Sequence, residues 1–306
     1  MVADRTGEKI KKPCVLKIQS KKDLISKGKV GVCIEEKQVL QMLNNPFIVD
    51  LVNAYQDKGF IYMLMEYLAG GELYSIMNPW ERRILPEAQA KFYILAIADA
   101  LAYVHQKKII FRDLKPENVL IDNLGYPKLI DFGFAKVVLE GKTFTLCGTP
   151  GYLAPELVLN IGHNKAVDHW QLGVLIYDML SFDSPFFNED MDEIEQFRCV
   201  IEDPVPEIAE PVSPEAWDLI LKLLTKDPKR RLGSRKRGEL DILHHKWFKD
   251  LTLSELRKRT ITAPWTPDMK DAFDTSNFED WTELDDIVAG DCAELSPEES
   301  KLFDGF

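Results

Sequence analysis

The sequence predicts an α+β fold with two lobes around a cleft, a small antiparallel β lobe followed by a larger, mainly helical lobe. Short apolar runs typical of strands occupy 13–18, 48–55 and 60–67, near the start of the chain. Longer, mostly apolar segments follow at 86–106, with Pro86 expected in the first helical turn, and at 168–180. With 306 residues, 45% of them hydrophobic, the chain can hold two lobes and is not mainly disordered.

Composition restricts the partners. The net charge of -12 argues against nucleic acid and anionic membrane surfaces and favours a basic substrate, although acidity that only aids solubility is the commoner case. Five scattered cysteines without metal-binding spacing suit a reducing compartment. The longest apolar segments are interrupted by Asp99 and Asp178 and are too short to span a membrane, and no signal-peptide pattern opens the chain. We expect a cytosolic protein, with the nucleus as a second location.

The small lobe is expected to contain a strand, a helix and a hairpin. The strand at 13–18 carries Lys17 among apolar neighbours. Apolar residues between 31 and 43 have helical spacing, so Glu36 lies in a helix with one apolar face. The next two strands are joined by a turn at 57–59, and two glycines soon after them suit a flexible connector between lobes.

The stretch Phe111–Gly133 organises the rest of the chain. Asp113, Asn118 and Asp131 are set between two short apolar runs that would pair across a turn at 123–125. Such a hairpin brings the three polar groups to one place. In-line phosphoryl transfer needs a carboxylate that accepts a hydroxyl proton, and hard oxygen ligands that hold Mg²⁺ on nucleotide phosphates.

These residues stand in motifs that resemble those of the protein kinase family. Phe-Arg-Asp at 111–113 resembles a catalytic loop, Asp-Phe-Gly at 131–133 a magnesium motif, and Ala-Pro-Glu at 154–156 the end of an activation loop. Further motifs narrow the resemblance to the AGC group, near the cAMP- and cGMP-dependent protein kinases: Phe-Ala-Lys at 134–136, Thr-Leu-Cys-Gly-Thr-Pro at 145–150, Arg-Leu-Gly at 231–233, His-Lys-Trp-Phe at 245–248 and Asp-Thr-Ser-Asn-Phe at 274–278.

The resemblance implies a serine/threonine kinase that uses ATP and Mg²⁺. By this match Asp113 is the catalytic base, Lys115 steadies the transferred phosphoryl group, and Asn118 with Asp131 binds the metal. Asp168 is expected to brace the backbone of the catalytic loop.

The same resemblance places the nucleotide between the lobes. Lys17 would contact the α and β phosphates, with its direction fixed by an ion pair to Glu36. The backbones of Glu66 and Leu68 would hydrogen-bond adenine, with Met65 at the back of the pocket. The expected nucleotide contacts are Val15, Lys17, Met65, Glu66, Leu68, Glu72, Glu117, Leu120, Ile130 and Phe278.

The activation loop is expected to carry a phosphosite at Thr145. A phosphate there would be held by Arg112 and Lys136, because cations bind phosphate through charge-assisted hydrogen bonds. At the end of the loop, Glu156 is expected to form a buried ion pair with Arg231.

The expected substrate has arginines two and three residues before the target hydroxyl. Glu117 and Asp178 would bind the nearer arginine and Glu72 the farther, since carboxylates bind guanidinium in bidentate fashion. Gly151 stands where related kinases carry a glutamate, so one acidic contact is missing. A hydrophobic residue after the target would lie against Leu146, Pro150 and Leu153.

The chain is expected to divide into a partial small lobe at 1–67, a large lobe at 68–250 and a C-terminal tail at 251–306. The glycine-rich loop and first strand that should precede Lys17 are not found, which indicates either a fragment or a divergent kinase. The acidic tail alone would look disordered, and a frayed terminus is common. The resemblance instead implies that the tail wraps over the small lobe and that Phe303 and Phe306 fill a pocket behind the helix of Glu36.

Two hypotheses follow. The first is a kinase that phosphorylates serine or threonine in basic protein substrates, with a cyclic-nucleotide-binding regulatory domain or subunit as a partner. The second is a pseudokinase or truncated fragment that binds regulatory partners without turnover. The active-kinase hypothesis is favoured by the presence of all the expected catalytic polar residues, which are Lys17, Glu36, Asp113, Asn118 and Asp131. The binding-module hypothesis is favoured by the missing glycine-rich phosphate loop.

Overall fold

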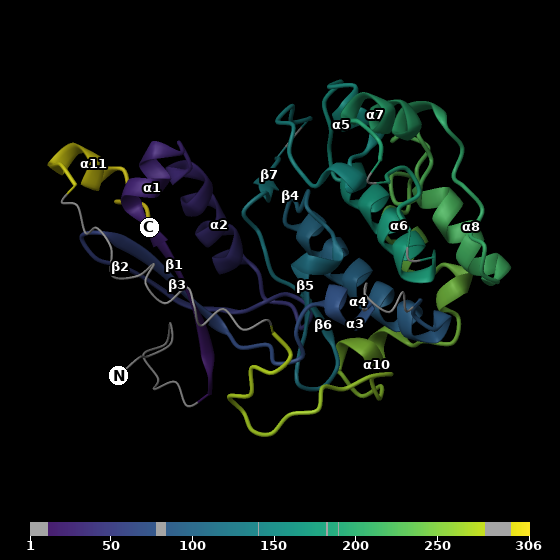
Figure 1. Cartoon of the computed structure of the whole chain (residues 1–306), viewed down its shortest axis with the longest axis horizontal. Helices are drawn as coiled ribbons and strands as arrows, with labels where there is room; N and C mark the ends of the chain where they lie inside the picture. Colours follow the sequence, from purple (N-terminus) through teal and green to yellow (C-terminus); the bar gives the residue numbers. More distant parts are fainter. Residues whose placement is uncertain (1–11, 78–83, 140, 182, 189, 279–294) are drawn as a thin grey trace.

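The computed structural model has the predicted α+β architecture, with a small β-containing lobe beside a larger helical one (Figure 1). The residues that the structure describes are 12–77, 84–139, 141–181, 183–188, 190–278 and 295–306. The sequence analysis finds no glycine-rich loop before Lys17. Residues 1–11, which belong to that part of the chain, are not among the described residues.

The small lobe is built on an antiparallel sheet with the strand order β1-β3-β2. Its strands are β1 (Cys14–Ser20), β2 (Leu51–Gln56) and β3 (Phe60–Glu66). Two helices, α1 (Lys21–Ser26) and α2 (Val30–Met42), connect β1 to β2. The sequence analysis missed α1, which is capped by the Ser20 side chain accepting from the Asp23 N–H at 3.4 Å.

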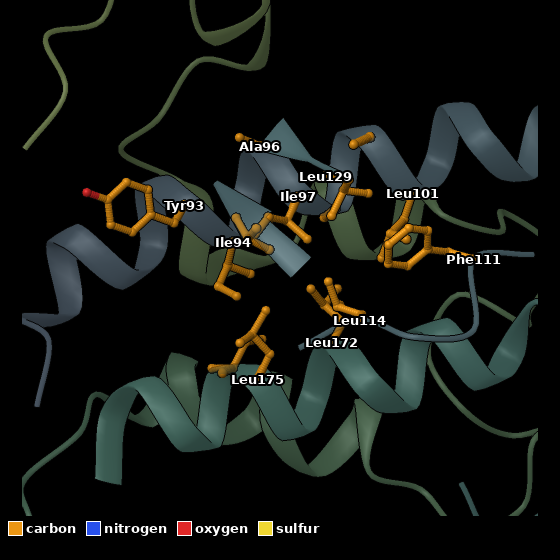
Figure 2. Packing of buried hydrophobic residues seen from close by; sticks show 14 of the residues in the cluster. Tyr93, Ile94, Ala96, Ile97, Leu101, Phe111, Leu114, Leu129, Leu172 and Leu175 are labelled. Atoms are coloured by element: carbon orange, nitrogen blue, oxygen red, sulfur yellow. The ribbon is translucent and has the colours of Figure 1, made fainter. Parts of the chain in front are cut away.

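The large lobe packs around two buried helices, α4 (Glu87–Gln106) and α6 (Ala166–Ser181). Figure 2 shows Leu175 of α6 pointing toward Ile94 of α4, with Leu172 beside Leu114, and burial of each such side chain contributes roughly 1.5–3 kcal/mol. Pro86 is the N-cap of α4 rather than a residue of its first turn, because its ψ of 134° is extended. This lobe also contains α3 (Leu73–Met77), α5 (Pro155–Val158), α7 (Glu193–Glu202), α8 (Pro214–Leu223) and α9 (Leu240–Leu243).

Short strands on the large lobe face the small one. The predicted hairpin is present as β5 (Val119–Ile121) paired with β6 (Pro127–Leu129). Its turn is closed by Asp122, whose carboxylate accepts from the N–H groups of Leu124 and Tyr126 at 2.8 and 3.0 Å. A second antiparallel pair joins β4 (Ile109–Ile110) to β7 (Lys136–Val137). These two pairs hold the stretch between 111 and 133 at the junction of the lobes.

The C-terminal tail runs from α10 (Leu253–Arg257) on the large lobe back to the small lobe, where α11 (Pro297–Lys301) and the C-terminus lie beside α1 (Figure 1). Phe303 is 0% exposed and packs with Leu24, Cys33 and Ile61. The expected docking of the terminal phenylalanines is therefore present. Among the described helices, none is long and apolar enough to cross a membrane.

Candidate active site

The backbone before Asp113 is held by buried side chains of α6. The Asp168 carboxylate accepts from the N–H groups of Phe111 and Arg112 at 2.9 and 2.7 Å, as expected. Gln171, which the sequence analysis missed, donates to the Arg112 carbonyl at 2.9 Å and accepts from the Leu114 N–H at 3.1 Å. Arg112 has a φ of 71°, an uncommon conformation for a residue with a Cβ. Gln171 follows Asp168 by three residues, so both lie on the same face of the helix. This spacing is the signal that could have identified Gln171.

Asp113 is buried and surrounded by donors. Its Oδ2 accepts from Nδ2 of Asn118 at 2.7 Å, and its Oδ1 accepts from the hydroxyl of Thr149 at 3.0 Å. The Nζ of Lys115 lies 3.7 Å from Oδ2. A hydroxyl thus fits directly against this carboxylate, with a lysine beside it.

Asn118 and Asp131 offer oxygen atoms suited to Mg²⁺. Nδ2 of Asn118 donates to both the carbonyl and the carboxylate of Asp113, which turns the amide oxygen away from Asp113. Asp131 accepts the Gly133 N–H through Oδ1 at 2.9 Å. A Cβ at Gly133 would lie 3.1 Å from that oxygen, so glycine suits the position. One carboxylate and one amide oxygen are a donor set that Mg²⁺ accepts, and bound Mg²⁺ would neutralise phosphate charge.

Lys17 and Glu36 form the expected ion pair, with Nζ 2.7 Å from Oε1. Glu36 lies on α2 with its side chain 5% exposed, whereas Lys17 on β1 remains 32% exposed. Burial raises the pKa of Glu36, and the Lys17 ammonium opposes that shift. The adjacent Glu35 is exposed, and its Oε1 lies 3.9 Å from Nζ of Lys136 instead.

A cavity of about 430 Å³ lies beside this pair, and it is lined by apolar side chains of both lobes. The expected nucleotide contacts that line it are Val15, Lys17, Met65, Glu66, Leu68, Leu120, Ile130 and Phe278. Glu72 and Glu117 do not line it. Val49, Tyr67 and Thr275 do line it but carried no sequence signal, because only tertiary packing brings them there.

The tail is fastened to the segment between the lobes. Asn277 donates through Nδ2 to the Ala69 carbonyl at 2.9 Å, and the Tyr67 hydroxyl donates to the Asp274 carbonyl. Gly71 has a φ of 75°, and a Cβ there would lie 2.4 Å from the Asn277 carbonyl oxygen. Only glycine fits this approach of two backbones.

The activation loop brings Thr145 to the surface, where it is exposed. Arg112 donates through Nε to the Phe134 carbonyl at 2.7 Å, and its buried Nη1 has no hydrogen-bond partner among the described residues. At the loop's end the expected pair is present, since both terminal nitrogens of Arg231 donate to Glu156.

The expected arginine-binding carboxylates include one with an unusual environment. Asp178 accepts from the hydroxyl of Tyr152 at 2.6 Å. Burial, followed by the nearby charge of Glu117, raises the pKa of Asp178 from 3.8 to about 6. Glu117 and Glu72 are half-buried. Of the three residues expected to face a hydrophobic substrate side chain, Leu146 and Pro150 are exposed and Leu153 is buried.

Comparison with known proteins gives the same assignment. The family described as "Protein kinase domain" matches residues 2–248. The chain is 44% identical over 250 residues to the cAMP-dependent protein kinase catalytic subunit of Dictyostelium discoideum, covering 81% of this chain and 37% of that protein. It is 41% identical over 285 residues to the cAMP-dependent protein kinase catalytic subunit PRKX of Mus musculus, covering 92% and 77% of the two chains.

The human cGMP-dependent protein kinase 2 is also similar, at 37% identity over 266 residues, which are 86% of this chain and 34% of that protein. The chain thus spans little more than a third of two of these three relatives. The family match and these relatives show that the chain belongs to the protein kinase family, within its AGC group of serine/threonine kinases.

Proposed function

We propose that this chain transfers the γ-phosphoryl group of MgATP to a serine or threonine hydroxyl in protein substrates that carry arginines before the target. The observation that carries the proposal is that the Lys17–Glu36 ion pair and Asp131 line the same cavity. ATP would lie there with adenine against the apolar walls and phosphates near Lys17. Asn118 and Asp131 would hold Mg²⁺.

Asp113 would accept the proton of the substrate hydroxyl. The Thr149 hydroxyl, 3.0 Å from Oδ1, supports the idea that a hydroxyl can be oriented there. Lys115 would stabilise charge on the transferred group. The carboxylates of Glu117, Asp178 and Glu72 would bind substrate arginines, and the names of the cAMP- and cGMP-dependent relatives support a cyclic-nucleotide-binding regulatory partner.

The test is phosphate transfer from ATP to a peptide with two arginines before a serine. The wild-type chain is expected to transfer phosphate, and Asp113→Asn is expected to lower kcat by about 10²–10⁴-fold with ATP affinity retained. Lys17→Met should weaken ATP binding itself. Asp241→Asn, which changes a half-buried carboxylate of α9 that pairs with Arg237, is the matched control.

The binding-module hypothesis gives a different result. If the wild-type chain binds MgATP yet transfers no phosphate to any arginine-containing peptide or to itself, the chain is a scaffold and the proposed function is wrong.

A further inference from the structure

A second cluster of ionisable side chains lies away from the phosphoryl-transfer residues, where α4, α6 and α9 meet. It consists of His105 in the last turn of α4, His169 on α6 and Glu239 at the N-cap of α9. One nitrogen of each imidazole and one carboxylate oxygen all lie within 4.8 Å of one another. Both histidine side chains are 1% exposed, and the Glu239 side chain is 18% exposed.

The spacing of these atoms is that of a metal's ligands. Nδ1 of His105 lies 3.0 Å from Oε1 of Glu239, and Nε2 of His169 lies 3.7 Å from the same oxygen. In a tetrahedral site with metal–ligand bonds of about 2.0–2.2 Å, neighbouring ligand atoms are about 3.3–3.6 Å apart. The two nitrogen–oxygen distances lie on either side of that range, and the two histidine nitrogens, which lie within 4.8 Å of each other, would move closer when a metal binds.

His105 directs one ring nitrogen at each of two carboxylates, Asp168 and Glu239. Nε2 lies 2.7 Å from Oδ2 of Asp168, a carboxylate that also accepts from the catalytic-loop backbone. Asp168 accepts hydrogen bonds, so Nε2 donates to it, and Nδ1 faces the Glu239 oxygen. Either a ring proton or a bound cation can lie between these two atoms, which are 3.0 Å apart. A carboxylate behind the distal nitrogen of a histidine is the usual support of a metal-bound imidazole.

The environment of His169 independently supports a bound metal at this cluster. Neither of its ring nitrogens has a hydrogen-bond partner among the described residues, although the ring is buried. Its Nδ1 edge packs against Gly233, where a Cβ would lie 2.6 Å away, so Nε2 is the nitrogen directed at Glu239. A buried imidazole without a partner is costly unless something binds it.

We propose that His105, His169 and Glu239 form a Zn²⁺ site that ties α4, α6 and α9 together. Two imidazoles and one carboxylate suit Zn²⁺, whereas Mg²⁺ and Ca²⁺ prefer oxygen ligands alone. A cavity of about 200 Å³, lined by His105 and Lys165 among others, adjoins the cluster and leaves room for a water as fourth ligand.

Lys165 is the competitor for this position. Its Nζ lies 2.6 Å from Oε1 of Glu239, and its side chain is 41% exposed. The ammonium can move into solvent when Zn²⁺ takes its place. Zn²⁺ must therefore displace Lys165 from Glu239. Removing Lys165 should strengthen Zn²⁺ binding, whereas removing a ligand should weaken it.

The experiment titrates ZnCl₂ into the chelator-treated full chain, with accessible thiols alkylated and excess MgCl₂ present to occupy the oxygen ligands of the active site. Calorimetry is expected to show one saturable equivalent, and Zn²⁺ should raise the melting temperature. Co²⁺ in place of Zn²⁺ should give the intense visible bands of a tetrahedral site.

Glu239→Gln and His169→Gln should each weaken Zn²⁺ binding by more than about tenfold, and Lys165→Met should tighten it by about tenfold or more. His245→Gln, which alters another buried imidazole paired with a carboxylate, Asp218, is the matched control and should bind as wild type does. The proposal is overturned if wild type binds no better than His169→Gln, if Lys165→Met binds no better than wild type, or if the Co²⁺ spectrum is octahedral.

Discussion

Both terminal nitrogens of Arg231 donate to the carboxylate of Glu156, at 2.6 and 2.8 Å, and the two side chains are 0% and 1% exposed. We predict that Glu156→Gln lowers the free energy of unfolding by about 3–5 kcal/mol, because it leaves the guanidinium charge buried without a counter-charge. Chemical denaturation measures this. Lys27→Met, which breaks an exposed pair with Asp23, should change stability by less than about 1 kcal/mol. Equal effects of the two variants would contradict the prediction.

Phe303→Ala should lower both thermal stability and nucleotide affinity. Loss of a fully buried ring costs about 3–5 kcal/mol locally. Nucleotide affinity is affected because Lys37 on α2 donates to the Gly305 carbonyl at 2.8 Å, so the tail holds the helix that carries Glu36. Scanning calorimetry and ATP titration test both effects. The neighbouring Leu302 is 51% exposed, and Leu302→Ala is expected to be nearly silent in both measurements.

Affinity for an arginine peptide should depend on the protonation of Asp178. With its pKa raised to about 6, this carboxyl is largely neutral below that pH and ionised above it. Only the ionised form binds guanidinium strongly, so KM should fall as pH rises from about 5 to about 7. Asp178→Asn keeps an acceptor for Tyr152 and should flatten the profile. A wild-type profile that stays flat for the arginine peptide would rule out this role.

Gly151→Glu should increase selectivity for additional basic residues. A Cβ at Gly151 meets nothing closer than 3.6 Å, at Ser184 and Phe187, so a larger side chain fits without displacing the backbone. One exposed charge contact contributes roughly 0.2–1 kcal/mol, so kcat/KM for a peptide with an extra arginine should rise by up to about fivefold. Paired peptides with and without that arginine give the ratio. Gly151→Gln serves as the neutral control and should leave it unchanged.

Phosphorylation of Thr145 should activate the enzyme. The added charge of about -1.5 to -2 would engage the buried Nη1 of Arg112, with Lys136 as the second cation. A charge-assisted hydrogen bond contributes about 1.5–3 kcal/mol, so Thr145→Ala should lower kcat/KM by about tenfold or more. Thr143→Ala in the same loop is the control. Mass spectrometry of active protein that finds Thr145 unmodified would refute the prediction.

Residues close together in sequence could be predicted as one site. Asp113, Asn118 and Asp131 lie within a single hairpin, and the structure brings them together through β5 and β6. The Lys17–Glu36 pair could be placed because strand and helix periodicity locate each partner separately.

Other features depend on tertiary contacts that leave no local pattern. Val49 and Thr275 meet at the cavity although 226 positions separate them in the chain. Helix α1 has Leu24 as its one strongly buried apolar residue, beside the buried Lys21, which is too little apolar periodicity to predict a helix. His169 is a lone histidine in an apolar helix, and only the fold shows that it faces His105 and Glu239.

The cavity beside Lys17 and Glu36 cannot be complete until the C-terminal tail has been synthesised, because tail residues line it. Thr275 and Phe278 form part of a wall whose other members lie between Val15 and Asp131. During synthesis on the ribosome, a chain that already contains Lys17, Asp113 and Asp131 still lacks that wall. If the cavity binds the nucleotide as proposed, affinity would be acquired late, when the tail has emerged and folded back, and a nascent large lobe would exist for a time without the complete cavity.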